Sequence, residues 1–238
     1  MRAKSIALLI SLLAAGSMSA QANDWEFDAN LGWDNKYVSE GRNNLDKGGI
    51  VWGHVGASKN GFNLFADVGR GDQEHYIEYN IGASYAFEVE SLGVEAGYMR
   101  VEEYPDRPAS YGEYFLNLDY SRFAWLTPTV NYLYHDKNKG SFLTVGLESA
   151  WDLTERLSFT PYAAQSWDYG YALENFSGEN NFQFGVNLDY EVNANWSINA
   201  NLNRSIAGES IKQERIREGK DFAEINQTFG GVYVNYTF

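Results

Sequence analysis

The chain has 238 residues, of which 44% are hydrophobic and 16% aromatic, and it contains 23 glycines and no cysteine. Its formal net charge is −14, because 32 aspartates and glutamates outnumber 18 lysines and arginines. Phosphate binding needs clustered basic residues, so we expect no nucleic acid as a partner. Disulfides need cysteine, so they do not stabilise this chain.

The N-terminus has the three parts of a secretory signal peptide. Arg2 and Lys4 precede an apolar stretch over residues 6–16, and the small-residue site Ala20-Gln21-Ala22 follows. The apolar part is too short to span a membrane as a helix. We therefore expect a cleaved signal peptide over residues 1–22 and one domain over residues 23–238.

The mature chain shows strand periodicity throughout. In residues 24–34, Trp25, Phe27, Leu31 and Trp33 alternate with polar side chains, which indicates a strand with one apolar face. Residues 47–58 also favour a strand, although the pattern does not assign its faces. Further segments with this period are 61–69, 76–87, 91–99, 112–120, 125–134, 141–151, 156–164, 181–192, 195–202 and 230–238.

The connections between these segments alternate in length. Short ones cover 59–61, 88–91, 121–125, 152–156 and 192–195, whereas 34–46, 69–75, 100–110, 168–180 and 203–221 are long and polar, and 135–140 is intermediate. Residues 210–222 could form a helical turn or two within the last loop. Tight turns at one end and long loops at the other are typical of outer-membrane barrels. The sequence therefore predicts an all-β fold, a transmembrane antiparallel up-and-down β-barrel of about 12 strands in a bacterial outer membrane; a secreted β-sandwich or soluble barrel is the alternative.

Aromatic residues on the apolar face predict two girdles at the membrane–water interfaces. The expected girdle residues are Trp25, Trp33, Tyr85, Tyr98, Tyr120, Trp151, Trp196 and Phe238. The expected partners are outer-membrane lipids and lipopolysaccharide. The terminal Phe238 resembles the signal that bacterial outer-membrane proteins present to the barrel assembly machinery.

The opposite face of each strand is expected to line the lumen, and it is acidic. The expected pore-lining residues are Glu26, Asp28, Asp67, Glu78, Glu95, Glu113, Asp119, Glu148 and Asp189. Several glycines share this face, which keeps its side-chain volume low. Because rings of carboxylates select cations, we expect a porin-like channel for small polar solutes that prefers cations. Alternatively, these groups brace the wall of a closed barrel whose long outer loops bind a partner or a surface.

An outer-membrane hydrolase is the third hypothesis. It would use His75 with Asp72 and Glu74, together with His135 and Asp136 in another loop. His54 and Ser58 share a strand face but lie about 13 Å apart, too far for a nucleophile and its base. No metal-ligand spacing and no phosphate-binding glycine loop occurs, so we expect no cofactor, no metal and no enzymatic activity.

Three stretches carry a resemblance to a known family. They are residues 31–49, which contain Tyr37-Val38-Ser39-Glu40-Gly41-Arg42, then residues 57–69, and residues 104–120, which contain Tyr104-Pro105 and Glu113. Over roughly residues 30–120 the chain resembles the TorF family of porins, and the resemblance implies a porin-like function without naming a solute. The family usually has Arg before the turn glycine, where this chain has Glu40, with Arg42 after it.

Overall fold

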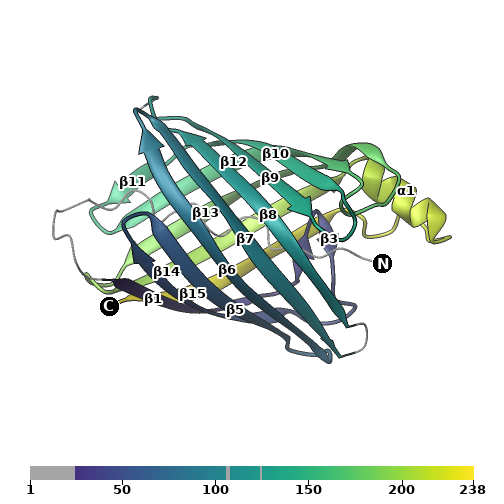
Figure 1. Cartoon of the computed structure of the whole chain (residues 1–238), viewed down its shortest axis with the longest axis horizontal. Coiled ribbons are helices and arrows are strands. Elements are labelled where there is room, and N and C mark those ends of the chain that lie inside the picture. The colour runs from purple at the N-terminus through teal and green to yellow at the C-terminus, as the bar shows by residue number, and fades with distance from the viewer. Residues whose placement is uncertain (1–24, 106–107, 124) are drawn as a thin grey trace.

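The computed structural model describes residues 25–105, 108–123 and 125–238, so the expected signal peptide over residues 1–22 lies outside the described residues. The chain forms a closed antiparallel barrel (Figure 1). Its first strand, β1 (Glu26–Asp34), pairs with its last, β15 (Gln227–Thr237), and this pairing closes the wall.

The other wall strands follow one another in chain order. They are β4 (Ile50–Lys59), β5 (Phe62–Gly71), β6 (Tyr76–Val89), β7 (Leu92–Pro105), β8 (Ala109–Tyr120), β9 (Thr127–His135), β10 (Ser141–Glu148), β11 (Trp151–Thr154), β12 (Leu157–Tyr169), β13 (Ser177–Glu191) and β14 (Trp196–Ala207). Both β10 and β11 pair with β12 and occupy one position, so the wall has twelve strands, as the sequence predicts. The break between β10 and β11 divides the segment 141–151, which the sequence pattern treats as one strand.

The register of the strands sets the two faces of the wall. Because successive side chains point to opposite faces, one set of alternating positions faces outward, and it includes the apolar residues Leu31, 64% exposed, and Ile81, 65% exposed. The same register assigns β4, where Val51 and Val55 face outward and Trp52 and His54 face the lumen. The outer surface is therefore a continuous apolar band, as a lipid-facing wall requires.

The two ends of the barrel differ. At one end the strands are joined by short turns, and the C-terminus lies there (Figure 1). The other end bears the long loops, with the small strands β2 (Val38–Ser39) and β3 (Arg42–Asn43) and the helix α1 (Glu209–Arg217), which lies in the expected helical stretch. We call these the short-turn end and the long-loop end. No helix of the described residues has the length and hydropathy needed to span a bilayer.

Large inward side chains lie over glycines of the neighbouring strand. Four of them face a glycine directly opposite in the register, and a Cβ on that glycine would collide with the ring. The pairs are Trp52 with Gly69, Phe65 with Gly82, Phe115 with Gly97, and Tyr233 with Gly32. The glycines of the inner face therefore make room for aromatic rings, which fill part of the lumen that the sequence predicts to be acidic.

Candidate functional site in the barrel lumen

The nine expected pore-lining carboxylates all occupy inward positions of the wall, but their surroundings differ along the barrel. Glu26 is exposed at the start of β1, and Asp119 and Glu148 lie near the short-turn end of β8 and β10. Asp119 interacts electrostatically with Glu148 and with Glu88, an inward carboxylate that the sequence analysis leaves out. The short-turn mouth is thus ringed by acidic side chains.

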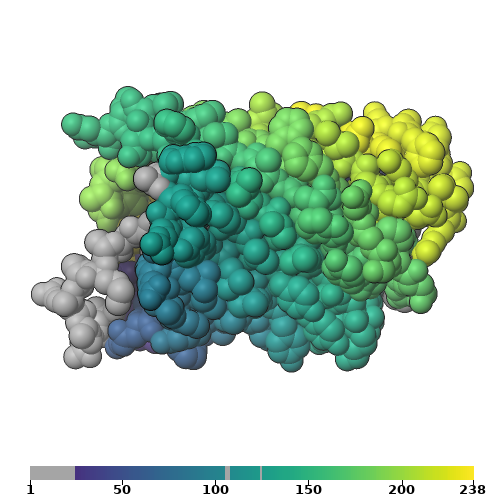
Figure 2. Space-filling model, turned by 90° about the horizontal axis from the view of Figure 1, so that it is seen from above, coloured from purple at the N-terminus to yellow at the C-terminus, as the bar shows by residue number. Residues whose placement is uncertain are grey.

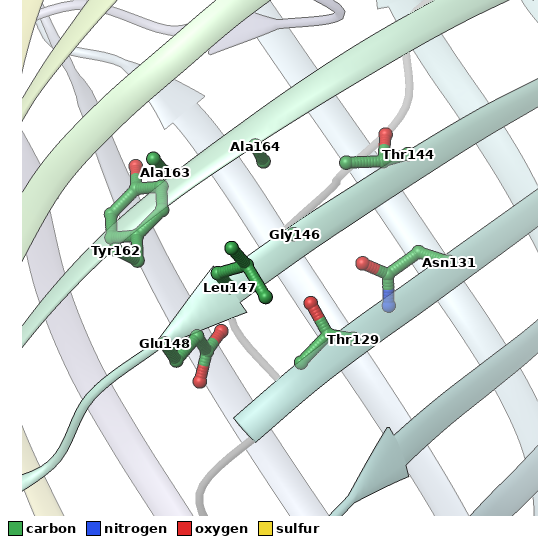
Figure 3. A pocket seen from close by; sticks show the side chains of 9 residues that line it. All are labelled: Thr129, Asn131, Thr144, Gly146, Leu147, Glu148, Tyr162, Ala163 and Ala164. Atoms are coloured by element: carbon green, nitrogen blue, oxygen red, sulfur yellow. The ribbon is translucent and has the colours of Figure 1, made fainter. Parts of the chain in front are cut away.

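A small recess in the inner wall lies beside Glu148 (Figure 3). Its volume is about 10 Å³, enough for roughly one water molecule, and β9, β10 and β12 form its sides. Its inward side chains are short or polar, and they are Thr129, Asn131, Thr144, Glu148, Tyr162 and Ala164.

In the middle of the barrel, a histidine lies between two of the expected carboxylates. The Nδ1 atom of His54 is 2.6 Å from Asp67 Oδ1, and its Nε2 atom is 3.0 Å from Asp28 Oδ2. An ionised carboxylate only accepts hydrogen bonds, so a doubly protonated imidazole satisfies both contacts. The sequence does not predict these contacts, because the pattern of residues 47–58 does not assign the face of His54.

Two further carboxylates take part in hydrogen bonds along the wall. Glu95 accepts from Ser84 Oγ at 2.7 Å and from Asn117 Nδ2 at 3.1 Å, and Asp189 accepts from Asn199 Nδ2 at 2.7 Å. Both carboxylates are half-buried. They therefore connect neighbouring strands through hydrogen bonds and also face the lumen.

Glu78 and Glu113 are fully buried in the long-loop half. Glu78 accepts hydrogen bonds from the phenols of Tyr37, at 2.8 Å, and Tyr76, and Glu113 accepts one from the phenol of Tyr171. Burial, together with the neighbouring carboxylate, raises the pKa of Tyr37 and that of Tyr171 well above the usual value of a phenol. These two loop tyrosines therefore remain protonated donors.

Tyr37 and Tyr171 belong to segments that fold into the long-loop end of the barrel. Besides residues 35–49 and 170–176, the start of α1 is buried there through Ser210 and Ile211. We call residues 35–49, 170–176 and 208–217 the cap. The ring of Tyr37 packs against Trp52 and Tyr76, with centroids 5.5 and 5.8 Å apart, so part of the cap lies inside the lumen.

The basic residues are placed differently from the acidic ones. Within the described wall strands, every lysine and arginine occupies an outward position, and these residues are Lys59, Arg70, Arg100 and Arg204. On the inner face of these described strands, the basic side chains are two histidines, His54 and His135. The inner wall formed by the described strands is therefore acidic, with no inward lysine or arginine.

The histidines proposed for a hydrolase do not form such a site in the described structure. His75 is exposed in its loop, whereas His135 is buried, with its ring stacked on that of Tyr111 at 4.3 Å. The Nδ1 atom of His135 accepts from the backbone N–H groups of Lys137 and Asn138. No hydrogen bond joins either imidazole to a carboxylate among the residues that the structure describes.

Most of the expected girdle residues lie on the outer face towards the ends of the strands. Trp33, at the long-loop end, donates its indole N–H to Asp72 Oδ2 at 2.8 Å. Tyr98 lies nearer the middle of β7, packed on Tyr114, and Tyr120 is half-buried against Phe123. Those towards the short-turn end are Trp25, Tyr85, Tyr120, Trp151, Trp196 and Phe238.

A closed barrel with an apolar outer band defines the class of the protein, an outer-membrane β-barrel. Solved structures with a similar fold include a KdgM porin, with a TM-score of 0.59 at 15% identity over 90% of this chain and 99% of that chain. A KdgM porin in complex with disordered oligogalacturonate has a TM-score of 0.58 at 16% identity over the same shares. The COG4313 outer membrane channel from Pseudomonas putida F1 has a TM-score of 0.52 at 10% identity, over 94% of this chain and 98% of that chain.

At these identities the likeness concerns the fold, which is that of porin-like outer-membrane barrels. No protein-family model matches the sequence, and no curated protein matches it. The chain is thus placed in the outer membrane by its architecture and its apolar exterior.

Proposed function

We propose that the protein is a passive outer-membrane channel for small polar solutes and that it prefers cations. The observation that supports this best is the distribution of charge across the wall, with the nine expected carboxylates inward and every described strand lysine and arginine outward. A low-dielectric tube lined by one sign of charge concentrates ions of the opposite sign. The porin and channel names of the structural neighbours support the non-enzymatic interpretation, and kinship with the TorF family remains a prediction.

The acidic lumen also bears on the kind of solute. One of the neighbouring KdgM structures contains oligogalacturonate, a chain of acidic sugars. Carboxylates on the inner wall repel such a polyanion, and no inward lysine or arginine of the described strands compensates for them. We therefore propose cationic and neutral polar solutes for this barrel.

Liposome swelling tests this proposal with two solutes of similar size and opposite charge, lysine and glutamate. We expect lysine to enter faster than glutamate. The double substitution Asp119→Asn with Glu148→Gln removes two carboxylates of the short-turn mouth and should bring the two rates together. Glu102→Gln is the matched control, because Glu102 is an outward carboxylate that pairs with Arg100 at 3.0 Å. Faster entry of glutamate in the unsubstituted protein would reject the cation preference.

A second candidate function is a closed barrel whose loops bind a partner, and the inward-folded cap favours it. The absence of solute entry in the unsubstituted protein and in a variant that loosens the cap, such as Arg42→Ala, would support this candidate and reject the channel.

We further propose lipid and assembly partners on the outer surface. An apolar groove of about 390 Å³, bounded by Phe27, Ala29, Val55 and Phe238, suits lipid chains. Phe238 is 71% exposed and its backbone N–H donates to Phe27 O, which leaves the terminal ring accessible to the assembly machinery.

A further inference from the structure

Arg42 joins separate parts of the long-loop end. Its Nε atom is 2.5 Å from Glu214 Oε2 in α1, and its Nη1 and Nη2 atoms donate to Asn180 Oδ1 of β13, at 2.8 Å, and to Ser210 Oγ, at 3.1 Å. A further bond reaches the backbone oxygen of Glu40. One guanidinium therefore connects the hairpin β2–β3, the barrel wall and the helix.

This ion pair is shielded from water. The side chains of Arg42 and Glu214 are 9% and 15% exposed, so solvent screens their attraction less than that of a surface pair. Removing one partner of such a pair leaves the other charge buried without compensation. The cap should therefore respond strongly to substitution of Arg42.

In the part of the chain that the structure describes, the hairpin has no strand pairing with the wall. β2 and β3 pair only with each other, in a two-stranded sheet separate from the barrel. Side-chain contacts hold the hairpin in the mouth. Tyr37 donates to Glu78 of the wall, and Asn180 Nδ2 of the wall donates to Glu40 O at 2.8 Å. Arg42 adds the contacts described above. The hairpin can therefore leave the lumen without breaking any ladder hydrogen bond of the wall.

The rest of the cap is linked to the same partners. Asp168 accepts from the backbone N–H groups of Tyr171 and Leu173 at 2.8 and 2.9 Å, and from Ser210 Oγ at 2.8 Å. Ser210 thus contacts both Arg42 and Asp168. Ser210 of the helix therefore links Arg42 of the hairpin to Asp168, which holds residues 170–176. Release of Arg42 breaks this link.

We propose that the cap is a lid over the long-loop end and that Arg42 is the latch that holds it closed. Displacement of the hairpin uncovers Glu78 and the aromatic rings around Tyr37, and widens the path through the lumen. The expected effect of the lid on current rests on the proposed channel function. The movement of the lid can be measured without any current.

Single-channel recording and cysteine labelling together test the lid. The chain has no cysteine, so Ser39→Cys, at a site 3% exposed in the hairpin, places one thiol in the buried part of the cap. In this background we compare Arg42, Arg42→Ala, Arg42→Lys and the control Arg100→Ala. Arg100 is an outward arginine whose ion pair with Glu102 lies 3.0 Å apart on the barrel surface.

We expect Arg42→Ala to speed maleimide labelling of the thiol at least tenfold and to raise the open probability or the conductance. Arg42→Lys keeps the charge but lacks the planar fork, so it should give an intermediate result, and Arg100→Ala should match the parent. Glu214→Gln, which removes the partner of Arg42 in α1, should also speed labelling and serves if Arg42→Ala fails to fold.

Unchanged labelling and unchanged current in the Arg42 and Glu214 variants would overturn the lid and leave the channel intact. Faster labelling in a barrel that never conducts would support the movable cap and reject the proposed channel function. The two proposals therefore fail separately.

Discussion

At the scale of single residues, the inner wall depends on close pairs of glycine and an aromatic ring. Phe115 lies over Gly97 and Phe65 over Gly82, each directly across a strand pair. Any side chain at these glycines occupies the volume of the ring and forces it out of place. The glycines of the inner face are therefore packing positions.

Substitution of one such glycine should destabilise the barrel. We expect Gly97→Ala to lower the free energy of unfolding by about 1–3 kcal/mol, because the added methyl displaces the Phe115 ring. Urea unfolding in detergent micelles, followed by tryptophan fluorescence, measures the change. Gly53→Ala is the control, since the nearest atom to its added Cβ is Val68 Cγ1 at 3.4 Å on the outer face. Equal losses in the two variants would contradict the packing role.

At the scale of elements, the hairpin β2–β3 depends on its turn. Glu40 and Gly41 form the two-residue connection and both have positive φ, at 45° and 75°, the geometry of a type I′ turn. A Cβ on Gly41 would also lie 2.9 Å from Asn181 Cγ and 3.0 Å from Ile211 Cδ1. The glycine thus permits both the turn and its close approach to the wall and to α1.

Gly41→Ala should loosen the hairpin. We expect faster labelling of Ser39→Cys in this variant, because the methyl group pushes the turn away from Asn181. Gly219→Ala separates this contact from backbone strain, since Gly219 has φ 66° and no described residue beyond its own segment has an atom within 4 Å of an added Cβ. If both variants increased the labelling rate equally, backbone strain would explain the effect, and the contact between Gly41 and Asn181 would not.

The sequence predicts the wall better than the cap. A period of two marks each strand because one face meets lipid and the other the lumen, so Leu31 and Val234 could be placed without a structure. The cap depends on contacts between residues far apart in the chain, such as Arg42 with Asn180 and Glu214, and no local pattern reports them. The turn around Gly41 was visible as a motif, but its position inside the mouth was not.

The same limit applies to the interior. Alternation predicts that Asp67 and Glu95 face inward, and the register agrees with this. It does not predict that His54 lies between two carboxylates, because the segment 47–58 mixes small, apolar and polar residues on both faces. It also does not reveal that Glu78 and Glu113 are enclosed beneath the cap, since burial there comes from the loops.

At the scale of the whole molecule, the inner wall carries carboxylates along the length of the barrel, and their burial differs between its two ends. The space-filling view shows a continuous outer wall, with the C-terminal loop and helix at one end (Figure 2). Carboxylates at the short-turn mouth, Asp119 and Glu148, are accessible to solutes, whereas Glu78 and Glu113 lie behind the cap.

We therefore expect Glu78→Gln to change ion selectivity less than the double substitution Asp119→Asn with Glu148→Gln, as reversal potentials would report. The opposite order would place the selective region beneath the cap.

The most direct test of the cation-preferring channel is the reversal potential of the purified protein in a planar bilayer under a KCl gradient. We expect a potential displaced towards the equilibrium potential of potassium, in the unsubstituted protein and in Arg42→Ala. A potential displaced towards that of chloride would contradict the cation preference, and the absence of any current in both proteins would contradict the channel itself.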